Sequence, residues 1–175
     1  MYSNIKRFYT ELPLKLNNII KVDDKQHHYL KNVLRIKSND LVRFFNGKEG
    51  EWLAKVIKVE RKYTSLSIQK NIGRQKQSPN LWLFFSPIKS DRLNILVQKS
   101  TELGVSKFIP VKTERSNMKN INYNNLRKNA IEASEQSTRL DVPIIEKELK
   151  VDDINRFLSV DRCVLYCDEK NINAN

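Results

Sequence analysis

Four polar side chains recur on one face of the helix that the sequence predicts over residues 124–140. Glu132, Glu135, Gln136 and Arg139 stand at i, i+3, i+4 and i+7, so they share one stripe. Small residues on the same helix indicate close packing against another backbone: Ala130, Ala133, Ser134 and Ser137. We therefore expect these carboxylate, amide and guanidinium groups to line a groove. The alternative is a solvated surface with a Glu135–Arg139 ion pair.

A second stripe lies on the helix predicted over residues 91–103. It consists of Ile95, Gln98, Lys99 and Glu102 at the same spacing. This stripe is either a solvated face carrying a Lys99–Glu102 ion pair or the second charged side of a cleft shared with the first helix.

A charged turn, Thr113–Ser116, follows directly on the strand predicted over residues 107–111. Ligands of open parallel sheets bind at the carboxyl ends of the strands. The turn is therefore a site candidate, although loops are also charged for solubility alone.

The histidines and cysteines do not form a recognisable metal site. His27 and His28 are adjacent on a predicted helix and point about 100° apart, so they cannot chelate one ion together. Cys163 and Cys167 fall in a predicted strand, where about 3.3 Å per residue separates them too far for a disulfide. We expect buried thiols, no metal and a reducing, cytoplasmic compartment.

The front of the chain is predicted to be a small β-rich unit. An apolar run over residues 19–22 precedes a helix that begins at Asp23 or Asp24 and continues to about Leu34. Strands are predicted over residues 41–45, 51–59 and 63–72, with Asn46-Gly47 supplying a tight turn. Several strands packed with one helix favour a compact barrel.

Behind a polar segment at residues 73–79, strands alternate with helices. Strands are predicted at 81–86, 107–111, 144–145 and 162–167, and helices at 91–103, 124–140 and 152–158. Gly104 suits the position that ends the first of these helices. The alternation predicts parallel strands joined by helical crossovers.

The chain is strongly basic, with 32 Lys and Arg against 20 Asp and Glu and a net charge of +12. Most of the excess lies before residue 74. A cationic surface attracts polyanions, so nucleic-acid binding is favoured over compositional drift. No segment is apolar enough to span a membrane, and residues 1–10 do not have the apolar run of a signal peptide.

Five motifs, in order, carry a resemblance to a known family. They are His27–Arg35, Phe45–Gly47, Gln98–Val105, Glu114–Ser116, and Glu132–Arg139 with Val142-Pro143. Together they resemble the RsmE family, small-subunit ribosomal RNA uridine N3-methyltransferases of the SPOUT class.

The resemblance implies a two-domain fold: a β-rich PUA-like RNA-binding barrel (residues 1–72), a linker (73–79) and part of an α/β parallel-sheet SPOUT domain (80–175). It implies S-adenosylmethionine as methyl donor and small-subunit ribosomal RNA, or the assembled small subunit, as partner. The family is homodimeric. The resemblance further implies a target pocket shaped by Glu102, Glu135, Gln136 and Arg139. RNA phosphate contacts are expected from six cations: Arg7, Arg35, Lys89, Arg92, Lys99 and Arg115.

The family binds its donor in a C-terminal trefoil knot with glycine-rich motifs, and these motifs are not in this sequence. Its four glycines are Gly47, Gly50, Gly73 and Gly104. We therefore expect an incomplete methyltransferase domain, without the knot and its dimer helices, and no methyl transfer by this chain alone. The alternatives are an RNA-binding module or a vestigial fragment.

Overall fold

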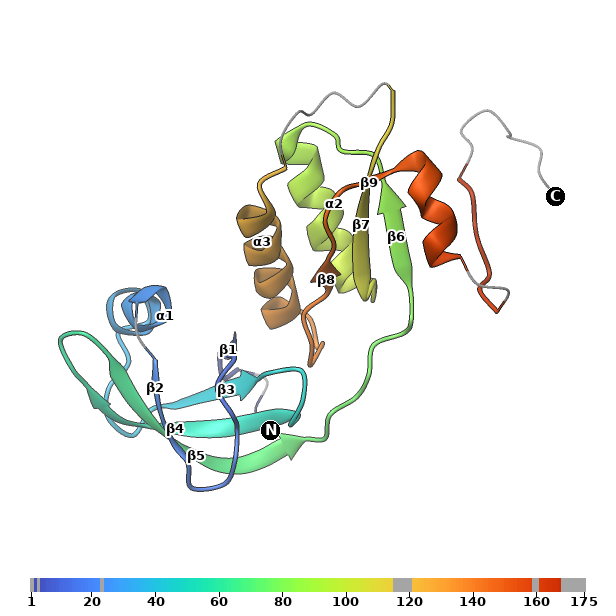
Figure 1. Ribbon diagram of the computed structural model, residues 1–175. Helices are drawn as coiled ribbons and strands as arrows, with labels where there is room; N and C mark the ends of the chain where they lie inside the picture. The colour runs from blue at the N-terminus through green and yellow to red at the C-terminus, as the bar shows by residue number, and fades with distance from the viewer. Residues whose placement is uncertain (1, 3, 23, 115–120, 159–160, 168–175) are drawn as a thin grey trace.

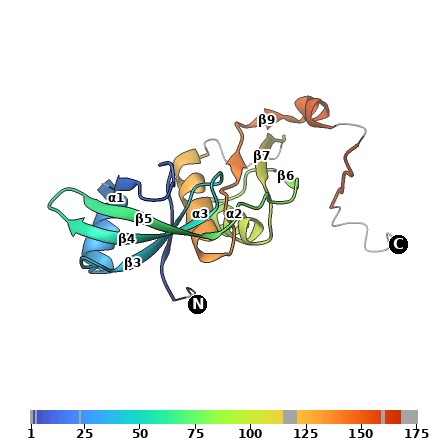
Figure 2. The ribbon, with the colours of Figure 1, turned by 90° about the horizontal axis from the view of Figure 1, so that it is seen from below.

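The chain folds into two sheets, each with its own apolar core (Figure 1). A computed structural model describes residues 2, 4–22, 24–114, 121–158 and 161–167. Seen from below, the two units lie beside each other, and β1 of the front unit contacts α3 of the rear unit (Figure 2). The segment between them, residues 74–81, has no regular secondary structure.

The front unit is a five-stranded sheet with the order β1-β3-β4-β5-β2. Its strands are β1 (Arg7–Tyr9), β2 (Ile19–Val22), β3 (Leu41–Phe45), β4 (Glu51–Val59) and β5 (Thr64–Gly73). β1 and β3 are parallel, and the other neighbouring strands are antiparallel. Alternate residues enter the core, as the period of a half-buried strand requires. Members of this core that are fully enclosed include Leu14, Leu30, Phe44, Leu66 and Ile68.

The predicted front helix is present over nearly its expected length, but its second half is wider than an α-helix. α1 (Asp24–His28) continues as a π-helix, η1 (Tyr29–Val33), in which the Leu34 amide donates to the carbonyl of Tyr29 at 3.0 Å. His27 is buried, and its Nδ1 lies 2.9 Å from Thr64 Oγ1. This buried hydrogen bond holds α1 against β5.

The turn before β4 confirms the prediction from Asn46-Gly47. Asn46 Oδ1 accepts hydrogen bonds from the amides of Lys48 and Glu49, and Gly47 has a φ of 80°. Gly50 is more tightly constrained, because a Cβ there would lie 2.1 Å from the carbonyl oxygen of Gly73. The turn therefore holds β4 and the end of β5 in contact.

The rear unit is a parallel sheet covered on both faces. β6 (Trp82–Phe85) pairs with β7 (Lys107–Lys112), which pairs in turn with β8 (Ile144–Ile145) and β9 (Leu149–Lys150). On one face lie α2 and α3, and on the other lies the 3₁₀ helix η2 (Figure 1). These helices span Ser90–Glu102, Tyr123–Gln136 and Val151–Phe157, respectively.

Side-chain alternation along β6 explains this layering. Leu83 and Phe85 belong to the apolar cluster under α2 and α3. Trp82 and Phe84 point the other way, and each meets the ring of Phe157 on η2 at about 6 Å. A continuous apolar run thus forms a strand buried on both faces, as the sequence predicted.

Three expectations for the rear unit were wrong: the end of the helix predicted to reach residue 140, the strand predicted at 162–167 and the burial of the two cysteines. The first helix ends at Gln136, whereas the helix predicted at 152–158 is present as a 3₁₀ helix. Residues 162–167 form no strand, and Cys163 and Cys167 are exposed rather than buried. An apolar pattern makes a strand only beside a partner strand, and within the described ranges residues 162–167 pair with none. Their hydrogen bond to the rest of the unit is made by the side chain of Arg162, which donates to Asn80 Oδ1.

Within the described ranges, no helix combines the length and apolar character needed to cross a membrane. The same ranges contain no group of three or more His, Cys, Asp or Glu arranged to hold a metal ion.

Candidate functional site

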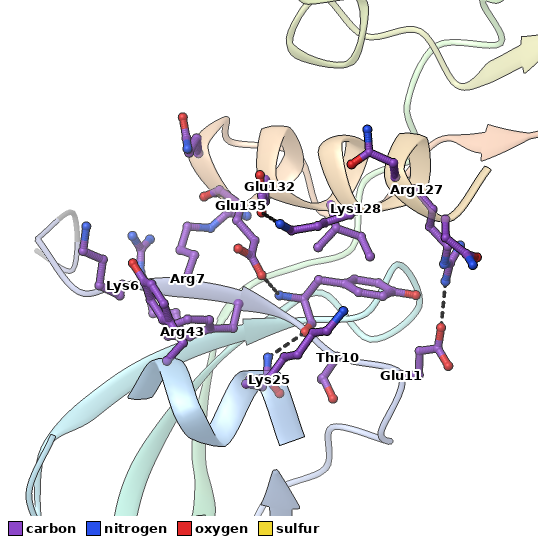
Figure 3. Close-up of a pocket in the computed structure, with 18 of the residues that line it drawn as sticks. Lys6, Arg7, Thr10, Glu11, Lys25, Arg43, Arg127, Lys128, Glu132 and Glu135 are labelled. Carbon is purple, nitrogen blue, oxygen red and sulfur yellow. Dashed lines mark hydrogen bonds and ion pairs between the residues drawn. The ribbon is translucent and has the colours of Figure 1, made fainter. Parts of the chain in front are cut away.

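A groove of about 1380 Å³ lies where the two units meet (Figure 3). Its walls come from β1 and the flanking N-terminal segment, from α1 and Arg43 of β3, and from α3. We call it the domain groove and define it by its nine charged residues. Six are basic and three acidic: Lys6, Arg7, Lys25, Arg43, Arg127 and Lys128 against Glu11, Glu132 and Glu135.

The charges on the rim of the domain groove leave a basic excess. Arg127 pairs with Glu11 at 2.7 Å, and Lys128 with Glu132 at 3.5 Å (Figure 3). Lys6 and Lys25 are exposed and have no ion pair among the described residues. Exposed cations of this kind attract phosphates and release counterions on binding.

The remaining lining is rich in amides and aromatic rings. Asn122 caps α3 by accepting the amide of Asn125, and both line the groove with Asn124. Tyr9 and Tyr29 contribute rings from the opposite wall. Amides can hydrogen-bond to the edges of nucleobases, and rings can stack on their faces. The groove therefore combines the three kinds of contact that RNA offers.

Arg7 lies behind the groove rather than along its rim, and its side chain is only 8% exposed. Its guanidinium pairs with Glu51 at 2.6 Å and lies 4.7 Å from the centre of the Phe45 ring. It also donates to the last carbonyls of α3 and the turn that follows: Ser134, Glu135, Ser137 and Arg139. A cation is favourable at a helix C-terminus because it satisfies free carbonyls at the negative end of the dipole.

Arg139 likewise donates hydrogen bonds to carbonyls at and just beyond the C-terminal end of α2. Its Nη1 donates to the carbonyls of Thr101 and Val105 at 2.9 and 2.6 Å, and its Nε pairs with Asp141 at 3.1 Å. Asp141 in turn accepts a hydrogen bond from Ser78 in the segment between the sheets. Arg7 and Arg139, together with Glu51 and Asp141, thus form what we call the domain joint.

Glu135 is the titratable group of the groove. It sits on α3, and its Oε1 accepts the amide of Tyr9 on β1 at 2.9 Å. Burial raises the pKa of this carboxyl from its usual 4.5 to about 7, and the nearby Glu132 acts in the same direction. The Tyr9 amide and Arg7 oppose the rise but do not cancel it.

This pKa predicts a pH dependence of stability. Between about pH 4.5 and about 7, the folded protein keeps a proton on Glu135 that the unfolded chain has lost. The contribution of this group to the free energy of unfolding therefore falls as the pH rises through that window. We expect Glu135→Gln to remove this decline. The melting temperature of the variant minus that of the wild type should therefore increase from about pH 4.5 to about pH 7 and stay constant above that.

The control for this measurement is Glu148→Gln, which neutralises an exposed carboxylate outside the domain groove. Melting curves of Glu135→Gln that stay parallel to the wild type across the whole window would contradict the raised pKa.

The four residues expected to shape a target pocket do not form one cluster. Glu135 faces the domain groove, whereas Arg139 is enclosed in the domain joint. Glu102 is exposed at the end of α2, where it accepts from Gln98 at 3.1 Å and pairs with Lys99 at 2.9 Å. Gln136 lines both the domain groove and a smaller cavity of about 140 Å³ between α2 and α3, which Gln98 also lines.

The six expected phosphate contacts are also scattered. Arg35, Lys89 and Arg92 are exposed outside the domain groove, and Lys99 pairs with Glu102. Arg115 lies outside the described residues, as does Ser116 of the predicted charged turn. The groove cations Lys6, Lys25, Arg127 and Lys128 were not anticipated. No local pattern marks them, because they come together only when the two units meet.

The domain joint lies at the amino ends of the parallel strands. β6 runs away from the front sheet, and α2 and α3 return toward it (Figure 1). The carboxyl ends of β6 and β7 are followed by Ser86 and Thr113, whose hydroxyls are 3.1 Å apart. Parallel sheets bind small ligands at that carboxyl end. The geometry thus separates the domain groove from the end of the sheet suited to a cofactor.

Two family models match the chain. Residues 75–175 match the RNA methyltransferase domain, and residues 22–69 match the RNA methyltransferase PUA domain. The first alone covers more than half of the chain.

Similar proteins agree with these matches. The ribosomal RNA small subunit methyltransferase E of Rickettsia conorii is 36% identical over 148 residues, which is 84% of this chain and 61% of that protein. Its counterpart from a Buchnera aphidicola strain (Acyrthosiphon pisum) is 31% identical with the same coverage. The chain thus spans about 61% of the length of the curated relatives it matches.

A solved structure agrees in fold. The crystal structure of ribosomal RNA small subunit methyltransferase E from Neisseria gonorrhoeae, bound to S-adenosyl methionine, matches with a TM-score of 0.80 at 25% identity. The match covers 90% of this chain and 67% of that one. With its PUA domain followed by a parallel-sheet methyltransferase domain, the chain belongs to the RsmE family of ribosomal RNA methyltransferases.

Proposed function

We propose that the domain groove binds small-subunit ribosomal RNA, as the recognition part of an S-adenosylmethionine-dependent methyltransferase. The observation that supports this most is a basic groove built jointly by the PUA domain and the methyltransferase domain. Its cations can hold phosphates, while its amides and rings can hold bases. We place the boundary between the domains at residues 73–79.

We further propose the N3 position of a uridine as the methylated atom. This nitrogen carries a weakly acidic proton, so transfer requires that the proton be withdrawn or the nitrogen polarised as the new bond forms. In this proposal, the residues of the domain groove bind and orient the RNA.

The described residues do not fit the methyl donor. The sulfonium of S-adenosylmethionine is a cation, and the domain groove has twice as many basic as acidic side chains. Close backbone approach to a ligand favours glycine. Gly47 and Gly50 lie in the PUA domain, Gly73 ends β5 at the domain boundary, and Gly104 follows α2. We propose that donor binding needs the knotted segment of the family, and that this chain does not transfer a methyl group without it.

Charge reversal tests the groove directly. We expect Lys6→Glu combined with Lys25→Glu to weaken binding to small-subunit ribosomal RNA about 10-fold or more at moderate salt, because two phosphate contacts become repulsive. The slope of log affinity against log salt should also become shallower by about 1–2. Filter binding over a salt series measures both.

Lys147→Glu combined with Lys150→Glu is the matched control. Both lysines are exposed, lie outside the domain groove and give the same change in net charge. Equal losses in the two double variants would show that overall charge, not the groove, attracts the RNA.

Methyl transfer is tested with labelled S-adenosylmethionine and small subunits purified from cells that lack this modification. Digestion to nucleosides distinguishes 3-methyluridine from other products. RNA binding with no transfer, even when the C-terminal segment of a relative is supplied, would favour the second candidate, an RNA-binding module.

A further inference from the structure

We propose that the domain groove takes unpaired RNA and stacks a base on Tyr29, rather than binding the outside of a duplex. This inference rests on the proposed function, because it specifies which form of RNA the same groove receives. It follows from the position of one ring, from the acid inside the groove and from the shape of the cavity.

Tyr29 is an exposed ring at a fixed position. It lines the domain groove and is 40% exposed, although it belongs to the wall that packs on the PUA core. Its ring centre lies 6.0 Å from that of Phe8, with the planes crossing at 69°. Phe8 is buried, so it holds the tyrosine ring against the wall while leaving part of it open. An exposed ring held in this way is a platform for a base, which stacks on any aromatic face.

Glu135 favours bases over phosphates in the interior of the groove. Glu11 and Glu132 are exposed on the rim in ion pairs with Arg127 and Lys128, whereas Glu135 is more enclosed. Carboxylates repel phosphates but accept hydrogen bonds from the amino and imino groups of bases. Such groups are accessible only when the base is not already paired. Lys6 and Lys25, which are exposed, can then hold the phosphates of the same strand.

The concave shape also selects against a duplex. The groove is walled on one side by β1 and α1 and on the other by α3 (Figure 3). A double-stranded RNA helix presents phosphates outward and hides its base faces, so it cannot reach Tyr29 at the wall. Single strands with splayed bases are the form that sequence-specific RNA-binding proteins recognise in such cavities.

The test uses a short fluorescein-labelled oligouridylate, alone and annealed to oligoadenylate, in an anisotropy titration. We expect the chain to bind the single strand more tightly than the duplex. Charge alone would give the reverse order, because the duplex has the higher phosphate density. Tyr29→Ala should weaken single-strand binding by about 5- to 100-fold and leave the weak duplex binding unchanged.

Two variants separate stacking from other effects. Tyr29→Phe keeps the ring and should bind like the wild type, and Tyr166→Ala removes an exposed tyrosine outside the groove. Tighter binding of the duplex, or equal single-strand binding by Tyr29→Ala and wild type, would overturn this inference. The proposed function would survive that result as long as the Lys6 and Lys25 reversals still weaken RNA binding. If the double variant Lys6→Glu with Lys25→Glu binds RNA as tightly as the wild type, the proposed function itself is overturned.

Discussion

Replacing Arg7 by alanine is expected to lower the free energy of unfolding by about 3–5 kcal/mol, the cost of breaking a buried ion pair from one side. The substitution leaves Glu51 with Arg43 as its remaining ion-pair partner. It also removes the donor to two carbonyls at the end of α3 and to two in the turn that follows. Denaturant unfolding, followed by the fluorescence of the two tryptophans, measures the loss. Trp52 lies in the PUA domain and Trp82 in the methyltransferase domain, so single-tryptophan versions report on each separately.

Arg127→Ala is the matched control, because Arg127 and Glu11 also link α3 to the PUA domain. That pair is 49% and 74% exposed, so its loss should cost less than about 1 kcal/mol. Arg7→Lys should fall between the two, since an ammonium keeps the charge but cannot reach Glu51 and several carbonyls at once. An Arg7→Ala variant as stable as Arg127→Ala would show that the domain joint does not hold the two domains together.

Arg139→Ala is expected to have the second largest effect, with a loss of about 3–4 kcal/mol. The guanidinium is 8% exposed and donates to the carbonyl of Thr101, at the end of α2, and to that of Val105, just beyond the helix. The Thr101 carbonyl also accepts the amide of Gly104, so the variant deprives the Val105 carbonyl above all. Asp141 would also lose its cation, although it keeps the hydrogen bond from Ser78. Thermal and denaturant unfolding measure the loss.

Gln136→Ala, on an exposed residue three positions earlier, should change the stability by less than about 0.5 kcal/mol. RNA affinity, measured well below the melting temperature, distinguishes the two roles that Arg139 could have. A positioning role predicts a large loss of stability with RNA affinity retained in the folded fraction. A variant with normal stability and no RNA binding would instead restore the expectation that Arg139 contacts the target.

Local patterns in the sequence predicted the elements well. The bounds of β3 and β4 match the predicted strands to the residue, and Gly104 follows α2 with a φ of 101°, as a helix-ending glycine should. These features depend on side-chain alternation and on turn residues, both of which are visible within a few positions. The family models match the same two kinds of domain in the same order, a PUA domain and then a methyltransferase domain.

The candidate site was less predictable because it depends on contacts between distant segments. The stripe that ended at Arg139 assumed a helix to residue 140, but α3 stops at Gln136 and its last carbonyls are taken by Arg7. Beyond that point the chain turns, and Arg139 points into the interior instead of continuing the stripe. Helical periodicity identifies a polar face, but it does not show what that face will meet.

The span of the Arg7 contacts has a consequence for biosynthesis. Its carbonyl acceptors lie 127 to 132 positions further along the chain, so they leave the ribosome long after Arg7 itself. The first sheet can close as soon as β5 has emerged, because all of its strand pairings lie within residues 7–73. We therefore expect the amino-terminal unit to fold first, with Arg7 already paired to Glu51. Once α3 has been synthesised, Arg7 can bind its carbonyls and join the second unit to the first.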